Sequence, residues 1–337
     1  MAKRSRNHEL RSAQASKKDE FYTTFQDIEL EMESYKDCFV GRVVYCNCDD
    51  PRFSNFFRYF CDNFEALGLK KVMATCFTPL EPAPFGEAFT DHGIYAEYTG
   101  EGPYEDTVIL RPLKGDGDFR SEECVGFLKE ADVVVSNPPF SLAREYLAQL
   151  VEFRKDFAFL GNMNIVTDQK IFSLFVKGQI GYGPSIRSGD RAFRVPEDYP
   201  LDAATSYTDV EGNRYIRVKG VRWFTNLTDC IHHQRLHLEK NYSPEDYPKY
   251  ANFDAIEVSK TKDIPLDYAG PMGVPLTFLD KYNPQQFEIL GSSEDFAAPM
   301  SKIAEKGTYT PRKGRFFLPR NDGTYQQLYF RIVIRHR

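Results

Sequence analysis

Short apolar runs and helix-like stretches alternate through the first half of the chain. Runs rich in β-branched and apolar residues predict buried strands at 42–47 and 132–136 and further strands at 71–77, 107–110 and 157–160. The stretches around them predict helices at 19–35, 51–68, 121–130, 141–153 and 168–177. Strands that alternate with helices are typical of a doubly wound α/β sheet, so we expect that fold class for the chain up to about residue 180.

Three residues mark the ends of the expected helices. Pro51 suits the first turn of the helix after the first strand, because its ring fixes a helical φ and the amide it lacks would have no partner there. Gly68 would end that helix. Ser141 would cap the helix that follows the strand at 132–136.

The pattern changes after Ile180, where Pro, Asn, Tyr and Arg become frequent and the expected strands become short. We therefore divide the chain into a basic N-terminal arm at 1–18, an α/β core at 19–180 and an irregular region at 181–337. Within the core, residues 79–106 are rich in Pro, Gly and acidic side chains, and we interpret them as an insertion or a hairpin with loops.

Composition argues against several classes of protein. The sequence has no run of about 18 apolar residues and no apolar segment at its N-terminus, so we expect neither a membrane partner nor a secretory signal. The seven cysteines form no CxxC pair, and Cys46 and Cys48 have no second Cys/His pair at ligand spacing. We interpret them as reduced, mostly buried thiols of a cytoplasmic protein without a metal site.

Charge is distributed unevenly along the chain. The formal net charge is −6, yet residues 1–18 carry six Lys or Arg against one acidic residue, and residues 301–337 carry nine against two. Two basic ends on an acidic body fit contact with a phosphate backbone. A solvated tail with chance clustering explains the same distribution, and both interpretations stay open.

The tetrapeptide Asn137-Pro138-Pro139-Phe140 directly follows the expected strand at 132–136. In open α/β sheets, ligands bind beyond the carboxyl ends of the strands, which is where these residues would lie. The Asn137 side-chain oxygen and the Pro138 carbonyl are two hydrogen-bond acceptors, and the two prolines contribute no donor. Phe140 adds a flat face on which a base can stack.

Such a loop suits the methylation of the exocyclic amino group of adenine, whose lone pair is conjugated into the ring and is a weak nucleophile. Two acceptors aimed at the amino protons would draw the nitrogen toward tetrahedral geometry and free the lone pair for in-line attack on a sulfonium methyl group. Positioning and electrostatics would supply the catalysis without a strong general base. The alternative is a turn that only ends the strand, since N-P and P-P are common in loops.

Two further stretches are candidates to line a cofactor pocket. Asn47, Asp49 and Asp50 follow the first strand before a helix, where α/β enzymes hold nucleotide-like cofactors, and the absence of GxGxxG argues against a dinucleotide. Asp118 and Phe119 lie in a glycine-containing turn and could bond and cover an adenine ring. A helix cap and a polar turn are the simpler interpretations of these two stretches.

Long strings of the sequence resemble, in the same order, the EcoRI-type adenine-specific DNA methyltransferases. The matching strings are DEFYT at 19–23, VVYCNCDDPRFSNFF at 43–57, GDGDFRS at 115–121, ADVVVSNPPFSLAREYL at 131–147, WFTNL at 223–227 and TKDIPLDYAGPMGVPLTFL at 261–279. The resemblance implies a Rossmann-like methyltransferase core, S-adenosylmethionine as methyl donor and double-stranded DNA with a short palindromic target as substrate. It also implies that a monomer can act alone, although the sequence leaves the oligomeric state open. A restriction endonuclease for the same site is a candidate partner, and methylation without such an endonuclease is the alternative.

The resemblance assigns roles to particular residues. Asn137, Pro138 and Phe140 become the catalytic motif. The cofactor motifs contain Tyr22, Thr23, Asp49, Asp50, Asp118 and Phe119. The sequence departs from amino-methyltransferases in general in two places, because CNCDDP replaces FxGxG and the strand at 71–77 ends without an acidic residue.

The region 181–337 is the candidate for target recognition, because the core motifs end before it. Its basic residues are candidates for contact with guanine or, more often, phosphate: Arg187, Arg191, Arg194, Arg214, Arg217, Arg222, Arg312, Lys313 and Arg315. We interpret Trp223 and Phe224 as core residues. We interpret the three neighbouring histidines as surface or core residues rather than metal ligands: His232, His233 and His237.

Two rival functions remain on sequence alone. Enzymes that methylate cytosine amino groups, RNA adenine or protein glutamine also contain NPP-plus-aromatic motifs, and substrate assays separate these. A DNA-binding protein that has lost catalysis is the second rival, and cofactor binding would discriminate it. The long C-terminal region and the basic ends favour DNA as the substrate, and the intact motif argues against a loss of catalysis.

Overall fold

The computed structural model describes residues 23–48, 50–77, 92–187, 190–195, 206–210, 212–227 and 235–337. The chain divides into two compact units, of which the first comprises Met1–Ile171 and Gly178–Ile231 and the second comprises Phe172–Lys177 and His232–Arg337. The first unit therefore continues to residue 231, whereas the sequence predicted an end of the core near 180. No helix in the described part of the chain is long and apolar enough to cross a membrane.

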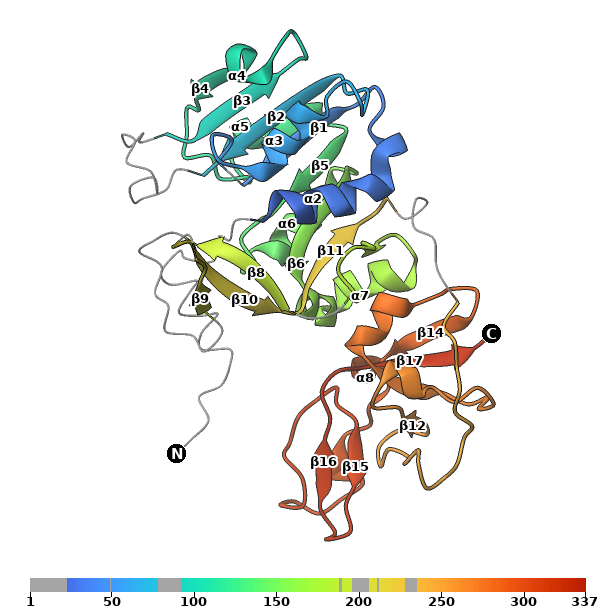
Figure 1. Ribbon diagram of the computed structural model, residues 1–337. Coiled ribbons are helices and arrows are strands. Elements are labelled where there is room, and N and C mark those ends of the chain that lie inside the picture. The colour runs from blue at the N-terminus through green and yellow to red at the C-terminus, as the bar shows by residue number, and fades with distance from the viewer. Residues whose placement is uncertain are drawn as a thin grey trace. The chain divides into compact units, whose positions relative to one another are not determined.

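An eight-stranded mixed sheet with the strand order β4-β3-β2-β1-β5-β6-β11-β7 forms the centre of the first unit (Figure 1). Its strands are β1 Val43–Asn47, β2 Lys71–Cys76, β3 Ile94–Tyr98, β4 Ile109–Pro112, β5 Val133–Ser136, β6 Asp156–Asn162, β7 Gly181–Tyr182 and β11 Val221–Thr225. The neighbouring strands β2, β1, β5 and β6 run parallel, and the strands outside them pair antiparallel. The parallel strands are buried on both faces, which is why they appear in the sequence as continuous apolar runs.

Helices cover both faces of this sheet, as expected for a doubly wound fold. The helical segments of this part of the chain are α2 Phe25–Met32, η1 Glu33–Cys38, α3 Asn55–Asp62, α4 Tyr104–Thr107, α5 Glu122–Glu130, α6 Ala143–Glu152, η2 Met163–Thr167 and α7 Gln169–Val176. Val44 and Cys46 of β1 belong to the apolar core formed with α2 and α3. Tyr45, between them, points to the other face and contacts Phe127 of α5.

Two predicted helix starts are wrong. The helix expected from Pro51 begins at Asn55, because Ser54 is the cap and its hydroxyl oxygen accepts hydrogen bonds from two amides of the first turn. Pro51 lies in a preceding turn that is closed by bonds from the amides of Phe53 and Ser54 to the Asp50 carbonyl. The helix expected to be capped by Ser141 has Leu142 at its cap position, with no side-chain hydrogen bond.

The described part of the insertion predicted at 79–106 contains regular structure. Residues 78–91 lie outside the described part, but β3 and α4 follow them. The strand predicted at 107–110 is β4, two residues further along the chain and exposed at the edge of the sheet. Four of the six cysteines in the described part of the chain are buried, which agrees with the prediction of mostly buried thiols.

The rest of the described chain forms three smaller sheets. A three-stranded antiparallel sheet in the first unit has the order β8-β10-β9, with β8 Asp190–Val195, β9 Ser206–Thr208 and β10 Arg214–Lys219. The second unit has a four-stranded sheet of β12 Ile256–Glu257, β13 Met272–Pro275, β17 Arg331–His336 and β14 Phe287–Ser292, and a hairpin of β15 Phe317–Pro319 and β16 Tyr325–Gln327. Its short helices are η4 Thr261–Asp263, η5 Leu276–Lys281, α8 Ser293–Phe296 and η6 Met300–Lys302.

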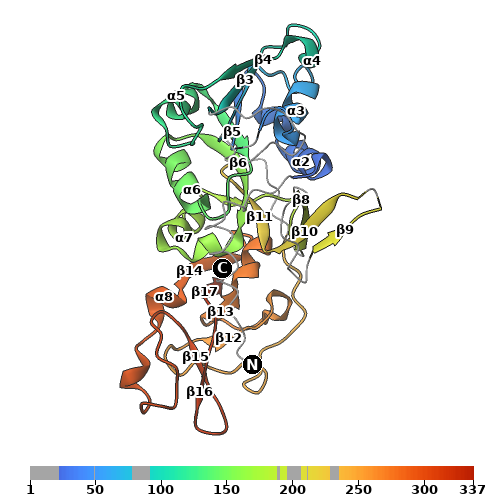
Figure 2. The same cartoon turned by 90° about the vertical axis from the view of Figure 1, so that its left-hand side faces the viewer.

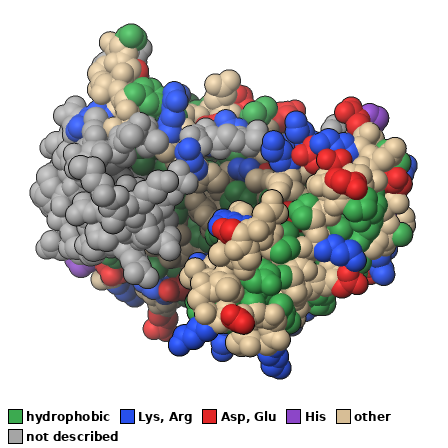
Figure 3. All heavy atoms as spheres, turned by 90° about the horizontal axis from the view of Figure 1, so that it is seen from below, with side chains coloured by type: hydrophobic (Ala, Val, Ile, Leu, Met, Phe, Trp, Pro, Cys, Tyr) green, Lys and Arg blue, Asp and Glu red, His purple; other side chains and the backbone are tan. Residues whose placement is uncertain are grey.

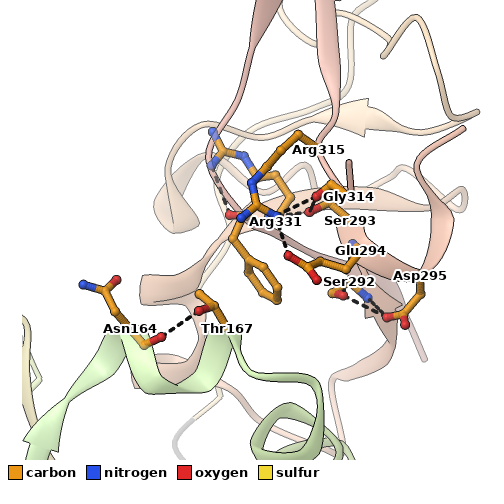
Figure 4. A network of polar contacts seen from close by, with 10 residues as sticks. Asn164, Thr167, Ser292, Ser293, Glu294, Asp295, Gly314, Arg315 and Arg331 are labelled. Carbon is orange, nitrogen blue, oxygen red and sulfur yellow. Dashed lines mark hydrogen bonds and ion pairs between the residues drawn. The ribbon is translucent and has the colours of Figure 1, made fainter. Parts of the chain in front are cut away.

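Basic residues of the C-terminal stretch take part in ion pairs within the second unit. Arg315 is nearly buried and binds Glu294 at 2.8 Å and the Gly314 carbonyl at 2.7 Å (Figure 4). Two more pairs join strands of the four-stranded sheet, Arg331 with Glu257 and Arg335 with Glu288. Figure 3 shows basic and acidic side chains interspersed over one face of the molecule. Part of the basic excess at 301–337 is therefore neutralised inside the protein, which weakens its interpretation as a phosphate footprint.

Glu31 is a carboxyl group buried inside the first unit. It lies on α2 and accepts hydrogen bonds from the Tyr35 hydroxyl at 2.6 Å and the Ser185 amide at 2.9 Å. Desolvation by burial raises its pKa, although these hydrogen bonds partly oppose the shift. Glu31 thus ties the N-terminal helix to the segment that leads into β8.

We expect the Glu31 carboxyl to make stability depend on pH in a defined direction. A carboxyl whose pKa is higher in the folded state stabilises the fold most at low pH, and that contribution is lost as pH rises through the folded-state pKa. The wild-type protein should therefore lose stability relative to Glu31→Gln as pH rises from about 4.5 toward neutrality. Urea unfolding of both proteins across this range measures the difference, and a difference of the opposite slope would contradict the assignment.

Candidate active site

The two central motifs meet at one edge of the sheet. β1 and β5 are parallel neighbours in a register that pairs Val44 with Val133, so Asn47 at the end of β1 and Asn137 just after β5 lie at the same carboxyl edge. β2 pairs with the other side of β1, and β6 with the other side of β5. The chain therefore leaves these two strands in opposite directions, and such a switch point is where open α/β sheets bind ligands.

The Asn137 loop is buried and rich in acceptors. Asn137 is 4% exposed, Pro138 is buried and Pro139 is half-buried. The Pro139 carbonyl accepts a turn bond from the Leu142 amide at 2.9 Å, whereas no backbone amide of a described residue donates to the Pro138 carbonyl. The loop therefore holds the side-chain amide and the Pro138 carbonyl that the sequence analysis selected as a pair of acceptors.

Phe140 is anchored by an aromatic contact that the sequence did not predict. Its ring is 7% exposed and packs edge-on against Phe193 of β8, with ring centroids 6.1 Å apart and planes at 83°. An edge-to-face pair of this kind leaves one ring face turned away from the partner. The three-stranded sheet that contains β8 therefore lies directly against the Asn137 loop.

Tyr146 on α6 connects the motifs of this edge. It is fully buried, and its hydroxyl donates to the Asn47 side-chain oxygen at the end of β1. Its ring packs edge-on against Phe119 at 5.2 Å. Burial raises the pKa of the Tyr146 hydroxyl well above its usual range, so it stays protonated and acts as a donor. Tyr146 was not among the residues predicted from the sequence, although its position on the helix after the NPPF loop was a signal.

The turn at 115–119 packs closely against the end of β2. Gly117 has a φ of +82°, and a Cβ at this position would lie 2.0 Å from the Cys76 carbonyl oxygen. Only glycine therefore fits here. The close approach places the buried Phe119 beside Tyr146, so the adenine-binding motif inferred from the sequence reaches the same edge as Asn47.

The candidate carboxylates of this edge both bind arginines. Asp50 is paired with Arg52 at 2.6 Å, and Asp118 is paired with Arg120 at 2.7 Å. Hydrogen bonds from Arg120 lower the pKa of Asp118, so this carboxylate is charged at neutral pH. Arg120 also lies over the Phe119 ring at 5.3 Å. A ligand that reaches either carboxylate must share it with an arginine, which the sequence did not reveal.

The N-terminal motif is only partly described. Tyr22 and Asp49 lie outside the described residues. Thr23 is buried, and its carbonyl accepts a hydrogen bond at 2.7 Å from Asn55, the first residue of α3. Its hydroxyl oxygen is buried and finds no hydrogen-bond partner among the described residues. Thr23 is thus held beside the helix that follows β1, with a polar atom available to a ligand.

Together, these groups fit S-adenosylmethionine. A buried aromatic ring suits its adenine, carboxylates suit its ammonium and ribose hydroxyls, and a buried hydroxyl without a partner suits a polar substituent. The described residues contain no group of three His, Cys, Asp or Glu positioned to hold a metal ion. His232 and His233 lie outside the described part, and His237 is exposed near Glu239.

Several candidates from the region after 180 are structural. Arg222 is 2% exposed and donates to the Val221 and Arg187 carbonyls, so it is not a reader of bases. Trp223 and Phe224 are fully buried, which confirms their prediction as core residues. Burial within β11, a strand of the central sheet, explains all three.

We expect Tyr146→Phe to weaken both the fold and the cofactor site. Loss of the buried hydroxyl leaves the Asn47 oxygen without its donor, at a cost of about 1–2 kcal/mol in the free energy of unfolding. Affinity for S-adenosylmethionine should fall several-fold, as measured by calorimetric titration. Tyr98→Phe is the control, because it removes a hydroxyl that donates to the Gly102 carbonyl and lies away from this edge. It should lower stability without changing the affinity for S-adenosylmethionine. Unchanged affinity in Tyr146→Phe would reduce Tyr146 to a core residue.

Comparison with known proteins identifies the family. A family model described as the adenine-specific methyltransferase EcoRI matches residues 9–337. The type II methyltransferase M.EcoRI of Escherichia coli is 46% identical over 295 residues, covering 86% of this chain and 90% of that protein. The type II methyltransferase M.MpnI of Mycoplasma pneumoniae is 39% identical over 287 residues, covering 84% and 85%. The chain therefore belongs to the EcoRI family of adenine-specific methyltransferases.

Proposed function

We propose that this protein transfers the methyl group of S-adenosylmethionine to the exocyclic 6-amino group of adenine in a short, specific sequence of duplex DNA. The observation that carries the proposal is the Asn137 loop, which holds two acceptors and an aromatic ring at the switch point between β1 and β5. The type II names of its relatives support DNA as the substrate.

The Asn137 loop would act on the amino group of the target base. The Asn137 side-chain oxygen and the Pro138 carbonyl would accept hydrogen bonds from its two N–H groups, which localises the lone pair on the nitrogen and directs it out of conjugation with the ring. The buried setting strengthens these hydrogen bonds because little water competes for them. The methylated amine is acidic enough to lose its proton without a dedicated base.

Phe140 would hold the target adenine outside the helix. An adenine stacked in a duplex cannot reach a buried loop, so the base must rotate out of the DNA. The contact with Phe193 fixes the Phe140 ring at its edge and leaves a face for stacking. Pro139 would contribute rigidity rather than an acceptor, since its carbonyl closes the turn.

The cofactor would occupy the neighbouring side of the same edge. S-adenosylmethionine supplies an electrophilic methyl group on a sulfonium centre. Phe119 would cover its adenine, and Asp118 would accept from the adenine amino group. The other candidates to bind it are Asn47, Asp49, Asp50, Tyr22 and Thr23. Arg52 and Arg120 would hold the two described carboxylates in place for this role.

A restriction endonuclease that cuts the same unmethylated sequence would be the partner of this activity in the cell. The relatives of this chain are named type II methyltransferases, and methylation by this chain would protect host DNA from such an endonuclease. We propose that one copy of the chain suffices for methylation.

The test is the identity of the methylated base. Purified protein is incubated with tritiated S-adenosylmethionine and methyl-free plasmid DNA, with RNA as a parallel substrate, and the products are digested to nucleosides. We expect the label in 6-methyladenine from DNA, and mapping then gives the target sequence. Label in 4-methylcytosine, in RNA alone, or in no nucleic acid despite cofactor binding would refute the proposal.

A further inference from the structure

The three-stranded sheet β8-β10-β9 has one aromatic and basic face. Residues opposite each other in an antiparallel sheet project to the same side, and Tyr215 of β10 lies opposite both Arg194 of β8 and Tyr207 of β9. Arg217, two residues after Tyr215, projects to that side as well. We call these four residues the Tyr–Arg face: Arg194, Tyr207, Tyr215 and Arg217.

The side chains of the Tyr–Arg face form a layered surface open to solvent. The Tyr207 and Tyr215 rings are stacked, with centroids 5.2 Å apart and planes at 12°. The Arg217 guanidinium lies over the Tyr207 ring, 5.2 Å from its centroid. Tyr207 is 38% exposed, and both arginines are exposed. The surface therefore combines flat rings with positive charge and is prearranged before any ligand arrives.

The opposite face of the same sheet packs against the candidate active site. Phe193 and Ile216 pair across β8 and β10 and are buried, and Phe193 makes the edge contact with Phe140. Figures 1 and 2 show the small sheet extending away from the central sheet. The two sheets are connected at Gly220, which lies between β10 and β11 of the central sheet. A ligand on the Tyr–Arg face would thus be separated from the Asn137 loop by the thickness of one sheet.

We propose that the Tyr–Arg face binds the DNA that flanks the target adenine. Guanidinium groups match phosphates in charge and geometry, and the Tyr207 ring holds the Arg217 guanidinium in place through a cation–π contact. Among the described residues of the β9–β10 turn, the Asp209 carboxylate accepts hydrogen bonds from the backbone and side chain of Asn213 and also interacts with the Tyr215 hydroxyl. The proposal rests on the proposed function and extends it with a positioning surface for the same DNA.

This role has a consequence for catalysis. DNA bound to the Tyr–Arg face would be fixed relative to Phe140, because Phe193 on the other face of the same sheet contacts Phe140. Weaker contact should therefore raise KM for DNA more than it lowers kcat. Affinity for S-adenosylmethionine should not change, because no residue of this face belongs to the cofactor motifs.

The test compares Arg194→Gln, Arg217→Gln and the double variant with the wild-type protein. Binding of a fluorescent duplex that contains the mapped site is measured by anisotropy between 50 and 200 mM salt. Each lost phosphate contact should reduce the slope of log K against log salt by about one and weaken binding about threefold at the higher salt. The double variant should bind about tenfold more weakly. Tyr207→Leu should weaken binding several-fold because it removes the ring that holds Arg217, whereas Tyr207→Phe keeps that ring and should not.

Arg111→Gln is the matched control. Arg111 also lies over a tyrosine ring, 4.3 Å from the centroid of Tyr95, but on β4 at the opposite edge of the central sheet. It should bind DNA as the wild type does. If the wild type methylates DNA but the Arg194 and Arg217 variants match this control, the Tyr–Arg face is not a DNA surface, although the proposed function stands. If the wild type neither binds nor methylates DNA, both fail together.

Discussion

Replacing Asn137 by alanine should reduce methyl transfer by about 10²–10³-fold while affinity for S-adenosylmethionine stays within about twofold. The expected loss is large because a buried acceptor aimed at the reacting amino group acts in the transition state rather than in binding. Single-turnover transfer of the tritiated methyl group to DNA measures the chemical step, and calorimetric titration measures cofactor affinity.

Two variants make this expectation specific. Asn137→Asp retains acceptor oxygens and should lose less activity than the alanine variant. Asn162→Ala removes another asparagine from the carboxyl end of the neighbouring strand, where its side chain binds the Asn164 amide and the Lys219 carbonyl. It should retain most of the activity. Equal loss in the Asn162 and Asn137 variants would mean that the edge of the sheet, rather than the acceptor, had been damaged.

Replacing Gly117 by alanine should cost about 3 kcal/mol or more in the free energy of unfolding and strongly weaken cofactor binding. A Cβ at this position would lie 2.0 Å from the carbonyl oxygen of Cys76, and the backbone φ of +82° is itself unfavourable for a side chain. Relief requires the turn to move off β2, which would carry Phe119 away from Tyr146. Urea unfolding and calorimetric titration measure the two effects.

Gly115→Ala is the control, because it changes the same turn without the collision. An added Cβ at Gly115 meets no atom within 4 Å, and we expect its stability to stay within about 0.5 kcal/mol of the wild type. If Gly117→Ala were equally harmless, the turn would be free to shift, and the close contact with β2 would not position Phe119.

Local signals in the sequence were sufficient to predict the parallel strands and to propose a reacting loop. Apolar runs predicted β1, β2, β5 and β6 nearly to the residue, because a strand buried on both faces must be apolar throughout. The chemistry of the NPPF loop could also be inferred locally, since its acceptors and its lack of donors belong to four consecutive residues. The start at Pro51 was wrong because Ser54 competes for the same cap and binds the helix amides directly.

Long-range packing decided the limits of the core and the environment of the site. β11 lies about forty residues beyond the predicted boundary, yet it pairs antiparallel with β6 of the core. Such pairing between distant segments produces no hydrophobic pattern in the sequence near residue 180, so the boundary was placed too early. The partners of the site residues were equally hidden. Tyr146 meets Asn47 across 99 positions of the chain, and Phe193 meets Phe140 from another sheet.

The sequence by itself therefore determined the fold class and the family and was enough to propose the reacting loop, because each depends on contiguous residues. The tertiary structure alone decided how the motifs come together through Tyr146. It also decided that the carboxylates Asp50 and Asp118 hold arginines, and that Arg222 is buried while Arg217 is exposed. The physical reason is that burial and pairing depend on which distant segments fold against a residue, and residue type alone does not specify those neighbours.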